Sequence, residues 1–479
     1  MINMKMQIGG KAVEACGCEF SDIINPATGE FIDRVPRGTE EDAAMAVEAA
    51  WSAFSDWAST SPQQRAGILY RAAGIVRERK DELAVLLTRE QGKPLTEAKN
   101  EIEGFANVLE YYCGLASSFH GDFIPIHQSG YAFTVKKPLG VCSAIIPWNM
   151  PALIMAWKIS PALISGNTLV LKPASSTPLT NLTLSSIFSE AGLPAGVLNI
   201  VTGPGEVVGE SLVKNRKVKR ISFTGETGTG KRVAELAASG MKRVTLELGG
   251  SDPMLVCDDA NLEAAVAGAL RGRFYNCGQI CTAVKRLFVF ESVAEEFIKK
   301  LEAGIRNLRV GNGLHEDVDM GPLNNRRQWE YIKELVAELK EKEEGRILTG
   351  GRVPEGSDYS KGYFFEPTLV ADVSEESRLL NEEVFGPVLP VVRVKDLDEA
   401  IEKANNTCYG LGASIWTKNI DRARIGCERL NAGIIWLNQH LKVAPEVPFG
   451  GTRESGIGKE NGPDALSEYL DLKTVMLKT

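Results

Sequence analysis

Two side chains suited to covalent chemistry stand among small residues in this chain. Cys281 lies in Phe-Tyr-Asn-Cys-Gly-Gln-Ile-Cys-Thr, and Glu247 precedes it in Leu-Glu-Leu-Gly-Gly. A cysteine thiolate attacks carbonyl carbons, a carboxylate can take a proton from water, and glycines leave space beside the backbone for a substrate and a cofactor. A free cysteine alone would more simply be a small buried residue of the core. Together the pair predicts a two-step oxidation through a thioester on Cys281.

Histidine-dependent and metal-dependent chemistry are disfavoured by the composition. Hydrolases of the Ser-His-Asp or Cys-His type need a histidine beside the nucleophile, and a zinc site needs a closed set of nitrogen and sulfur ligands. The cysteine pairs 16 with 18 and 277 with 281 lack partners that would complete such a set. None of the four histidines is paired at ligand spacing: His120, His127, His315 and His440. We expect no metal site.

Length, charge and cysteine usage limit the class of protein. The 479 residues exceed what one core usually supports, so two or more domains are expected. The net charge of −8, without a basic block, disfavours a nucleic-acid partner. The first twenty or so residues lack the apolar core of a secretory signal, and no run of about 18 apolar residues predicts a membrane span. Nine cysteines without a repeating spacing favour a reducing, cytoplasmic location.

Apolar and helical segments alternate along the chain, which predicts an α/β fold with doubly wound parallel sheets. Helical patterns at 39–55, from 61, and at 81–90 and 94–115 are followed by an extended hairpin at 122–137. Strands are then expected at 141–146, 168–171, 197–201 and 218–223, with helices at 151–165, 179–191, 205–214 and 228–238. A second α/β pattern has strands at 253–256, 286–290, 413–416 and 433–437 and helices at 262–276, 294–308, 328–343 and 420–430. Ligands bind at the carboxyl ends of such strands.

Two polar residues stand where strands of the first pattern end. Asn149 follows the strand at 141–146, where its amide could donate to a developing oxyanion or could cap the next helix. Lys172 ends the strand at 168–171, where a lysine suits a ribose hydroxyl or a phosphate, although a surface lysine is the simpler alternative.

Two further motifs are compatible with a nucleotide ligand. The Gly-rich turn at 223–230 joins a strand to a helix, whose free N–H groups can bind a pyrophosphate, but alone it is a weak signal. Glu383 and Phe385 are two positions apart, so on an extended loop both could face one ligand; otherwise they form a turn before a strand at 388–392.

The motifs taken together closely resemble those of the aldehyde dehydrogenase superfamily. They occur in the family's order over essentially the whole chain. The matching segments are Pro147-Trp-Asn149, Leu171-Lys-Pro-Ala174, Phe223-Thr-Gly225, Leu246-Glu-Leu-Gly-Gly250, Gly278-Gln-Ile-Cys281, Glu383-Val-Phe-Gly-Pro387, Pro448-Phe-Gly-Gly451 and Ser455-Gly-Ile-Gly458. The resemblance implies an enzyme that oxidises an aldehyde with NAD or NADP.

The resemblance also implies roles for single residues. Cys281 would be the nucleophile and Glu247 the base that activates water, while Asn149 and the Cys281 backbone N–H would form the oxyanion hole. Lys172 would hold the adenosine ribose, Glu383 and Gln328 the nicotinamide ribose, and Phe385 would pack beside the nicotinamide. The other cofactor contacts that we expect are Ile146, Trp148, Ser175, Gly205, Gly225, Glu226 and Leu248.

Three positions refine what the resemblance implies about reaction and coenzyme. Members that transfer the acyl group to coenzyme A lack the glutamate matching Glu247, so its presence favours a free carboxylic acid as product. Ser175 stands where many NAD-preferring members carry a glutamate, which inclines the prediction toward NADP. Glu226 replaces a common serine beside the pyrophosphate loop, and it should face solvent because an inward carboxylate would repel phosphate.

The expected substrate is a neutral, apolar or aromatic aldehyde. Trp157 and Tyr275 occupy positions where succinate-semialdehyde members carry arginines, and an aromatic pair cannot neutralise a distal carboxylate. Met150 would extend the apolar wall. Lys442, near the tunnel mouth by resemblance, leaves a short anionic semialdehyde as the alternative. A non-catalytic descendant of the fold is the remaining alternative, against which the intact Cys281 set argues.

The resemblance divides the chain into three parts. Residues 1–118 and 139–248 would form the dinucleotide-binding domain and 249–446 the catalytic domain. The hairpin at 119–138 and the tail at 465–479, which ends in an apparent edge strand, resemble the family's oligomerisation elements. A homodimer or homotetramer is expected.

Overall fold

The first of two α/β sheets contains the strands expected between residues 141 and 223. In this computed structural model, which describes residues 4–127 and 130–478, the strand order is β19-β11-β10-β7-β8-β9-β1-β2. The strands are β1 (Met6–Ile8), β2 (Lys11–Val13), β7 (Val141–Ile145), β8 (Thr168–Lys172), β9 (Leu198–Ile200), β10 (Val218–Thr224), β11 (Arg243–Glu247) and β19 (Gly456–Ile457). Strands β7 to β11 are parallel to their neighbours in this group, and β19 pairs antiparallel with the end of β11. The predicted strands are confirmed, whereas β1, β2, β11 and β19 were not predicted.

Helices cover both faces of this sheet, as the alternation of its side chains requires. Val141 and Ile145 of β7 pack in a cluster with α1, α7 and α8, while Cys142 and Ala144 pack with α2 to α6 on the opposite face. The helices are α1 (Glu40–Ser59), α2 (Pro62–Glu78), α3 (Lys80–Gln91), α4 (Leu95–Gly114), α5 (Pro151–Ile164), α6 (Pro178–Glu190), α7 (Glu210–Lys214) and α8 (Thr227–Ala238). The helix expected at 205–214 begins as one π-helical turn, η2 (Gly205–Gly209).

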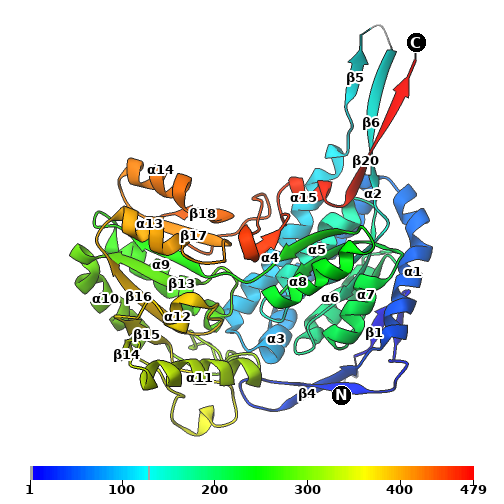
Figure 1. The fold of residues 1–479 in the computed structure, drawn as a ribbon. Helices are drawn as coiled ribbons and strands as arrows, with labels where there is room; N and C mark the ends of the chain where they lie inside the picture. Colours follow the sequence, from blue (N-terminus) through cyan, green and yellow to red (C-terminus); the bar gives the residue numbers. More distant parts are fainter. Residues whose placement is uncertain (1–3, 128–129, 479) are drawn as a thin grey trace.

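The second sheet has the order β14-β15-β16-β13-β12-β17-β18 and lies beside the first (Figure 1). Its strands are β12 (Asp252–Val256), β13 (Val284–Phe290), β14 (Arg346–Thr349), β15 (Thr368–Ala371), β16 (Val388–Val394), β17 (Gly412–Trp416) and β18 (Ile434–Leu437). Its helices are α9 (Leu262–Phe274), α10 (Glu291–Arg306), α11 (Arg326–Glu341), α12 (Arg378–Asn381), α13 (Leu397–Asn405) and α14 (Ile420–Arg429). The α/β fold is therefore confirmed in both halves of the chain, although β14, β15, α12 and α13 were not predicted.

Three antiparallel strands form an arm that stands away from both sheets, with the C-terminus near its tip (Figure 1). They are β5 (Phe123–Ile126), β6 (Gly130–Pro138) and β20 (Leu470–Leu477), and β20 pairs along the whole of β6. Both strands of the expected hairpin are present; residues 128 and 129 between them lie outside the described residues. Residues 1–3, predicted to be part of the dinucleotide-binding domain, and residue 479 of the predicted tail also lie outside them. The tail therefore finds its strand partner within the same chain.

Short elements complete the structure. They are the hairpin of β3 (Phe20–Ile24) and β4 (Phe31–Pro36), the turns η1 (Leu115–Ser118), η3 (Tyr275–Gly278), η4 (Ser357–Tyr359) and η5 (Arg453–Ser455), and α15 (Asp464–Ser467). Over residues 4–127 and 130–478, none of the helices has the length and apolar character needed to cross a membrane.

Candidate active site

A cleft of about 740 Å³ opens where β7, β8, β10 and β11 end and loops of the second sheet approach them. It is lined by all the predicted site residues except Ser175 and Gly205. Those in its wall are Ile146, Trp148, Asn149, Lys172, Gly225, Glu226, Glu247, Leu248, Cys281, Gln328, Glu383 and Phe385. Ser175 is exposed and its hydroxyl donates to the Gly203 carbonyl at 3.3 Å, and Gly205 is exposed at the start of η2.

The loop that carries Cys281 has an unusual backbone. The helix expected at 262–276 ends at Phe274, because Asn276 (φ 50°) and Cys277 (φ 56°) adopt the left-handed conformation. Such residues cost free energy unless their surroundings impose the conformation, and they concentrate at functional sites. Gly278 (φ 73°) is required here, since a Cβ atom at this position would lie 2.3 Å from the Gly386 carbonyl oxygen.

Asn149 holds its side chain toward the Cys281 loop. Its Nδ2 donates to the main-chain carbonyl of Gln279 at 2.9 Å. The capping alternative is not what the structure shows, because α5 is capped instead by Glu101, whose Oε1 accepts from the Ala152 N–H at 2.8 Å. An amide nitrogen has two hydrogens, so one N–H of Asn149 is free to point into the cleft.

Buried charges on α4 and in the loop before it hold the Asn149 loop and the Cys281 loop together. The fully buried Lys93 donates to the Glu101 carboxylate and to the Asn149 carbonyl, the latter at 2.8 Å. The same carbonyl accepts from Asn276 Nδ2 at 2.9 Å, and the Asn276 N–H donates to Glu97 at 2.9 Å. Asn149 and the left-handed turn before Cys281 are thereby held by α4 and the loop that precedes it.

Glu247 is a buried carboxyl group at the end of β11. Among the residues that the structure describes, neither of its oxygens has a hydrogen-bond partner. Burial raises its pKa well above the usual value, and the negative charge of Glu460 adds to this increase. Gly450 makes room for the group, since a Cβ atom there would lie 2.4 Å from Glu247 Oε1. A buried carboxyl without a protein partner is available to a water molecule or a thiol.

Cys281 is half-buried and lines the cleft. Burial raises the pKa of its thiol to about 12, whereas the positive charge of Lys285 opposes this increase. The sulfur is therefore a thiol at neutral pH in the absence of other groups, and it needs a base before it can attack.

Other residues of the cleft wall offer donors and a pair of aromatic rings that fit a nicotinamide dinucleotide. Lys172 is buried, and burial lowers its pKa to about 8; of its three N–H donors one reaches the Pro173 carbonyl, at 2.9 Å. Phe385 packs edge to face on Trp148 with 5.5 Å between ring centroids, and Gln328 Nε2 donates to the Phe385 carbonyl at 2.8 Å. Glu226 is exposed at the start of α8, as expected.

The residues predicted to shape the substrate side lie elsewhere than in the wall of this cleft. Trp157 is buried and packs on Phe449 with 5.0 Å between ring centroids. Tyr275 is half-buried beside Arg271, and Lys442 is exposed.

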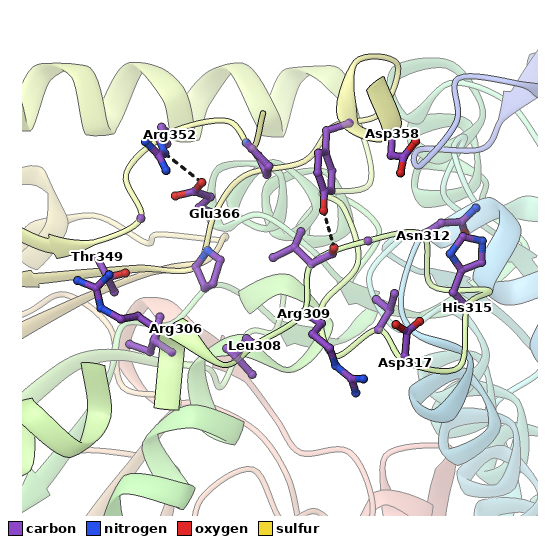
Figure 2. Close-up of a pocket in the computed structure, with 18 of the residues that line it drawn as sticks. Arg306, Leu308, Arg309, Asn312, His315, Asp317, Thr349, Arg352, Asp358 and Glu366 are labelled. Atoms are coloured by element: carbon purple, nitrogen blue, oxygen red, sulfur yellow. Dashed lines mark hydrogen bonds and ion pairs between the residues drawn. The ribbon is translucent and has the colours of Figure 1, made fainter. Parts of the chain in front are cut away.

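A second cavity, of about 800 Å³, lies on the second sheet and contains none of the predicted site residues. Figure 2 shows its charged side chains, of which Arg352 pairs with Glu366 at 3.0 Å. The Tyr359 hydroxyl donates to the Val310 carbonyl at 3.1 Å. A cavity that holds no candidate nucleophile and none of the predicted site residues is not the candidate active site.

The buried charges that position the loops were not predicted from the sequence. They are Lys93, Glu97, Glu101 and Lys285, together with Asn276. A signal was present for two of them, because Glu97 and Glu101 share a helix face with Ala98, Ile102 and Phe105, which are all in the core. Charged residues among core positions indicate a buried polar network.

Comparison with known proteins agrees with this geometry. Residues 13–475 match the Aldehyde dehydrogenase family. The betaine aldehyde dehydrogenase of Brucella anthropi is 41% identical over 473 residues, which cover 98% of this chain and 96% of that protein. An E. coli NADP-dependent enzyme of known structure has a TM-score of 0.97 at 38% identity, covering 100% of this chain and 98% of that one.

A further solved structure is similar over the same extent. The betaine aldehyde dehydrogenase of Staphylococcus aureus, solved in complex with NAD⁺, has a TM-score of 0.96 at 36% identity, covering 99% of this chain and 94% of that one. This chain belongs to the aldehyde dehydrogenase family and is an NAD(P)-dependent enzyme that oxidises an aldehyde.

Proposed function

We propose that Cys281 is the nucleophile, Glu247 the general base and Asn149 an oxyanion donor in the oxidation of an aldehyde to a free carboxylic acid. The observation that carries the proposal is that the half-buried thiol and the unpartnered carboxyl of Glu247 line one cleft with the amide of Asn149. A thiol, a base without another partner and a directed N–H donor are the groups that acyl chemistry on sulfur requires.

The residues act in two stages. Glu247 takes the proton of the Cys281 thiol, a sulfur–carbon bond forms at the carbonyl carbon, and the oxygen becomes an oxyanion that accepts from Asn149 Nδ2 and the Cys281 N–H. The bound coenzyme supplies an acceptor for the hydride, which leaves a thioester on Cys281. Glu247 releases the thiol proton to solvent and then, as a carboxylate, takes a proton from water, whose oxygen attacks the thioester; the carbon–sulfur bond breaks and sulfur leaves as thiolate.

For the coenzyme we propose Lys172 at the adenosine ribose, Glu383 and Gln328 at the nicotinamide ribose, and Phe385 beside the ring. The remaining contacts are as predicted from the sequence. We favour NADP, because Ser175 offers a hydroxyl where a carboxylate would repel a 2′-phosphate, and Arg327 adds a positive charge to the cleft wall. Ser175 and Gly205 would have to meet the coenzyme outside the described cleft.

We propose a neutral, apolar or aromatic aldehyde as substrate, and a panel of aldehydes with both coenzymes tests it. The support is that Trp157 and Tyr275 stand where, by resemblance, succinate-semialdehyde members carry the arginines that bind a carboxylate. Trp157 also packs on another aromatic ring, that of Phe449. The purified protein should reduce NADP with higher kcat/KM than NAD, and aromatic or aliphatic aldehydes should exceed short anionic semialdehydes. The absorbance of reduced nicotinamide gives the rates. Preference for a short anionic aldehyde would overturn the proposed substrate class and would favour the alternative in which Lys442 admits a semialdehyde.

The raised pKa of Cys281 predicts how the thiol responds to pH in the coenzyme-free protein. The thiolate fraction grows as pH approaches the pKa of about 12. The rate of alkylation of Cys281 by iodoacetamide should therefore increase roughly tenfold per pH unit between about pH 7 and pH 10. Mass spectrometry of the peptide that contains Cys281 measures it. A rate already constant above neutral pH would show that the free protein holds a thiolate.

We further propose a cytoplasmic homodimer or homotetramer, with residues 119–138 and 465–479 as oligomerisation elements and the domain division predicted above. The support is the arm, whose exposed apolar side chains include Phe123, Leu472 and Met476. A strand at the edge of a projecting sheet commonly pairs with or packs on another chain. All nine cysteines are free thiols, in keeping with a reducing compartment. Light scattering gives the mass in solution.

A further inference from the structure

Lys285 is a buried cation that contacts three of the proposed site residues, although nothing in the motifs singled it out. It is the second residue of β13, and its side chain is fully buried. Its Nζ donates to the Cys281 main-chain carbonyl at 2.5 Å and to Glu383 Oε1 at 3.0 Å. It also lies 5.7 Å from the centroid of the Phe385 ring. A buried ammonium group requires such partners, because an unpaired charge in the interior is costly.

The same contacts connect the loop of Glu247 to this cation. Glu383 Oε1, which accepts from Lys285, also accepts from the Gly250 N–H at 3.1 Å. Gly249 makes the approach possible, since a Cβ atom there would lie 2.3 Å from Glu383 Oε2. Within the described chain both hydrogen bonds to Glu383 are made to Oε1 and none to Oε2, and Glu383 lines the cleft.

We propose that Lys285 is a positioning residue that links the Cys281 main-chain carbonyl to the carboxylate of Glu383. It thereby fixes the position of the nucleophile relative to Glu383, the residue proposed to bind the nicotinamide ribose. The inference rests on the proposed function, because it takes Cys281 as the nucleophile and Glu383 as a coenzyme contact. Its alternative is a purely structural ion pair that stabilises β13. The two differ in what the loss of the charge does to the thiol and to coenzyme binding.

The charges around the thiol give the expected directions. Lys285 lowers the pKa of Cys281, whereas Asp252, Glu247 and Glu383 raise it. Removing the cation should raise the pKa of the thiol, and removing the charge of Glu383 should lower it. Both changes should weaken coenzyme binding. Loss of the Lys285 cation removes a hydrogen bond that holds Glu383, and loss of the Glu383 charge weakens the proposed contact with the ribose itself.

The test uses Lys285→Met, which keeps most of the length of the side chain without charge or donors. The pH profile of Cys281 alkylation in coenzyme-free protein should move up by about one unit or more. The Kd of NADP, followed by tryptophan fluorescence, should increase about tenfold or more. Lys285→Arg should restore both in large part, and Glu383→Gln should weaken NADP binding while moving the alkylation profile down. If Lys285→Met does not fold, Lys285→Gln is read in the same way.

Matched controls separate this proposal from stability and from the proposed function. Lys242 also donates to two main-chain carbonyls, those of Val213 and Asn215, away from the cleft, so Lys242→Met should leave both readouts unchanged. An unchanged profile and Kd in Lys285→Met, with only a lower melting temperature, would overturn the proposal. Retained turnover in Cys281→Ser would instead overturn the proposed function, and neither readout here depends on turnover.

Discussion

Replacing Cys281 with serine should reduce kcat for aldehyde oxidation by about 10⁴-fold or more, an effect of the size seen when a covalent nucleophile is removed. A serine hydroxyl is a weaker nucleophile than a thiol, and the only proposed base beside it, Glu247, is a carboxyl. Coenzyme binding should persist, since no proposed coenzyme contact is made by the sulfur. Reduced nicotinamide formed over time measures turnover, and fluorescence titration measures binding.

Cys113→Ser is a matched control for this variant. Cys113 is also half-buried, burial likewise raises its pKa to about 12, and it donates to the Ala66 carbonyl far from the cleft. A serine can keep that hydrogen bond, so activity should stay near that of the unchanged protein. If the serine variant at 281 kept substantial turnover, another residue would have to be the nucleophile.

The second large effect is expected from Glu247→Ala, which should separate the two stages of the reaction. Without the base for water, the thioester on Cys281 should persist, so one equivalent of reduced nicotinamide per site forms in a burst and the steady rate then falls by about 10²–10⁴-fold. The burst itself should be slower, because Glu247 also takes the thiol proton in the proposed mechanism. Rapid-mixing absorbance resolves the burst, and intact-mass spectrometry detects the acylated protein.

Glu90→Gln is a control variant at another buried glutamate. Glu90 is buried, its pKa is raised to about 7 by burial, and it accepts from the Leu179 and Thr180 N–H groups rather than lining the cleft. Its loss should lower the melting temperature without producing a burst. Steady turnover equal to the burst rate in Glu247→Ala would exclude Glu247 as the base for hydrolysis.

Much of the fold and most of the site could be predicted from the sequence because local patterns encode them. Apolar runs such as 141–146 and 218–223 became parallel strands, and the residues following them reached a common cleft. The turn at 275–278 could not be predicted in this way. Its left-handed residues depend on contacts with Glu97 and Gly386, which are distant in sequence. The helix predicted from local propensity was therefore two residues longer than α9, which ends at Phe274.

Short strands and buried charges escaped prediction for related reasons. β11 ends in Glu247 and could not be predicted from an apolar run, because three of its five residues, Arg243, Thr245 and Glu247, are polar or charged. Lys285 follows the motif by only a few positions, but its role depends on contacts with Glu383, which is far along the chain. Ser175 was placed by resemblance alone, and in the structure its hydroxyl bonds to a neighbouring loop.

The pairing of β19 with β11 also determines when the pocket around Glu247 can form during synthesis of the chain. Gly456 sits opposite Glu247, and Gly450 packs against the Glu247 carboxyl, so segments made some two hundred residues apart must meet before that pocket closes. Contacts between distant segments form late in folding. A ribosome-bound chain that stops short of these glycines would carry the thiol but lack the finished pocket around its base.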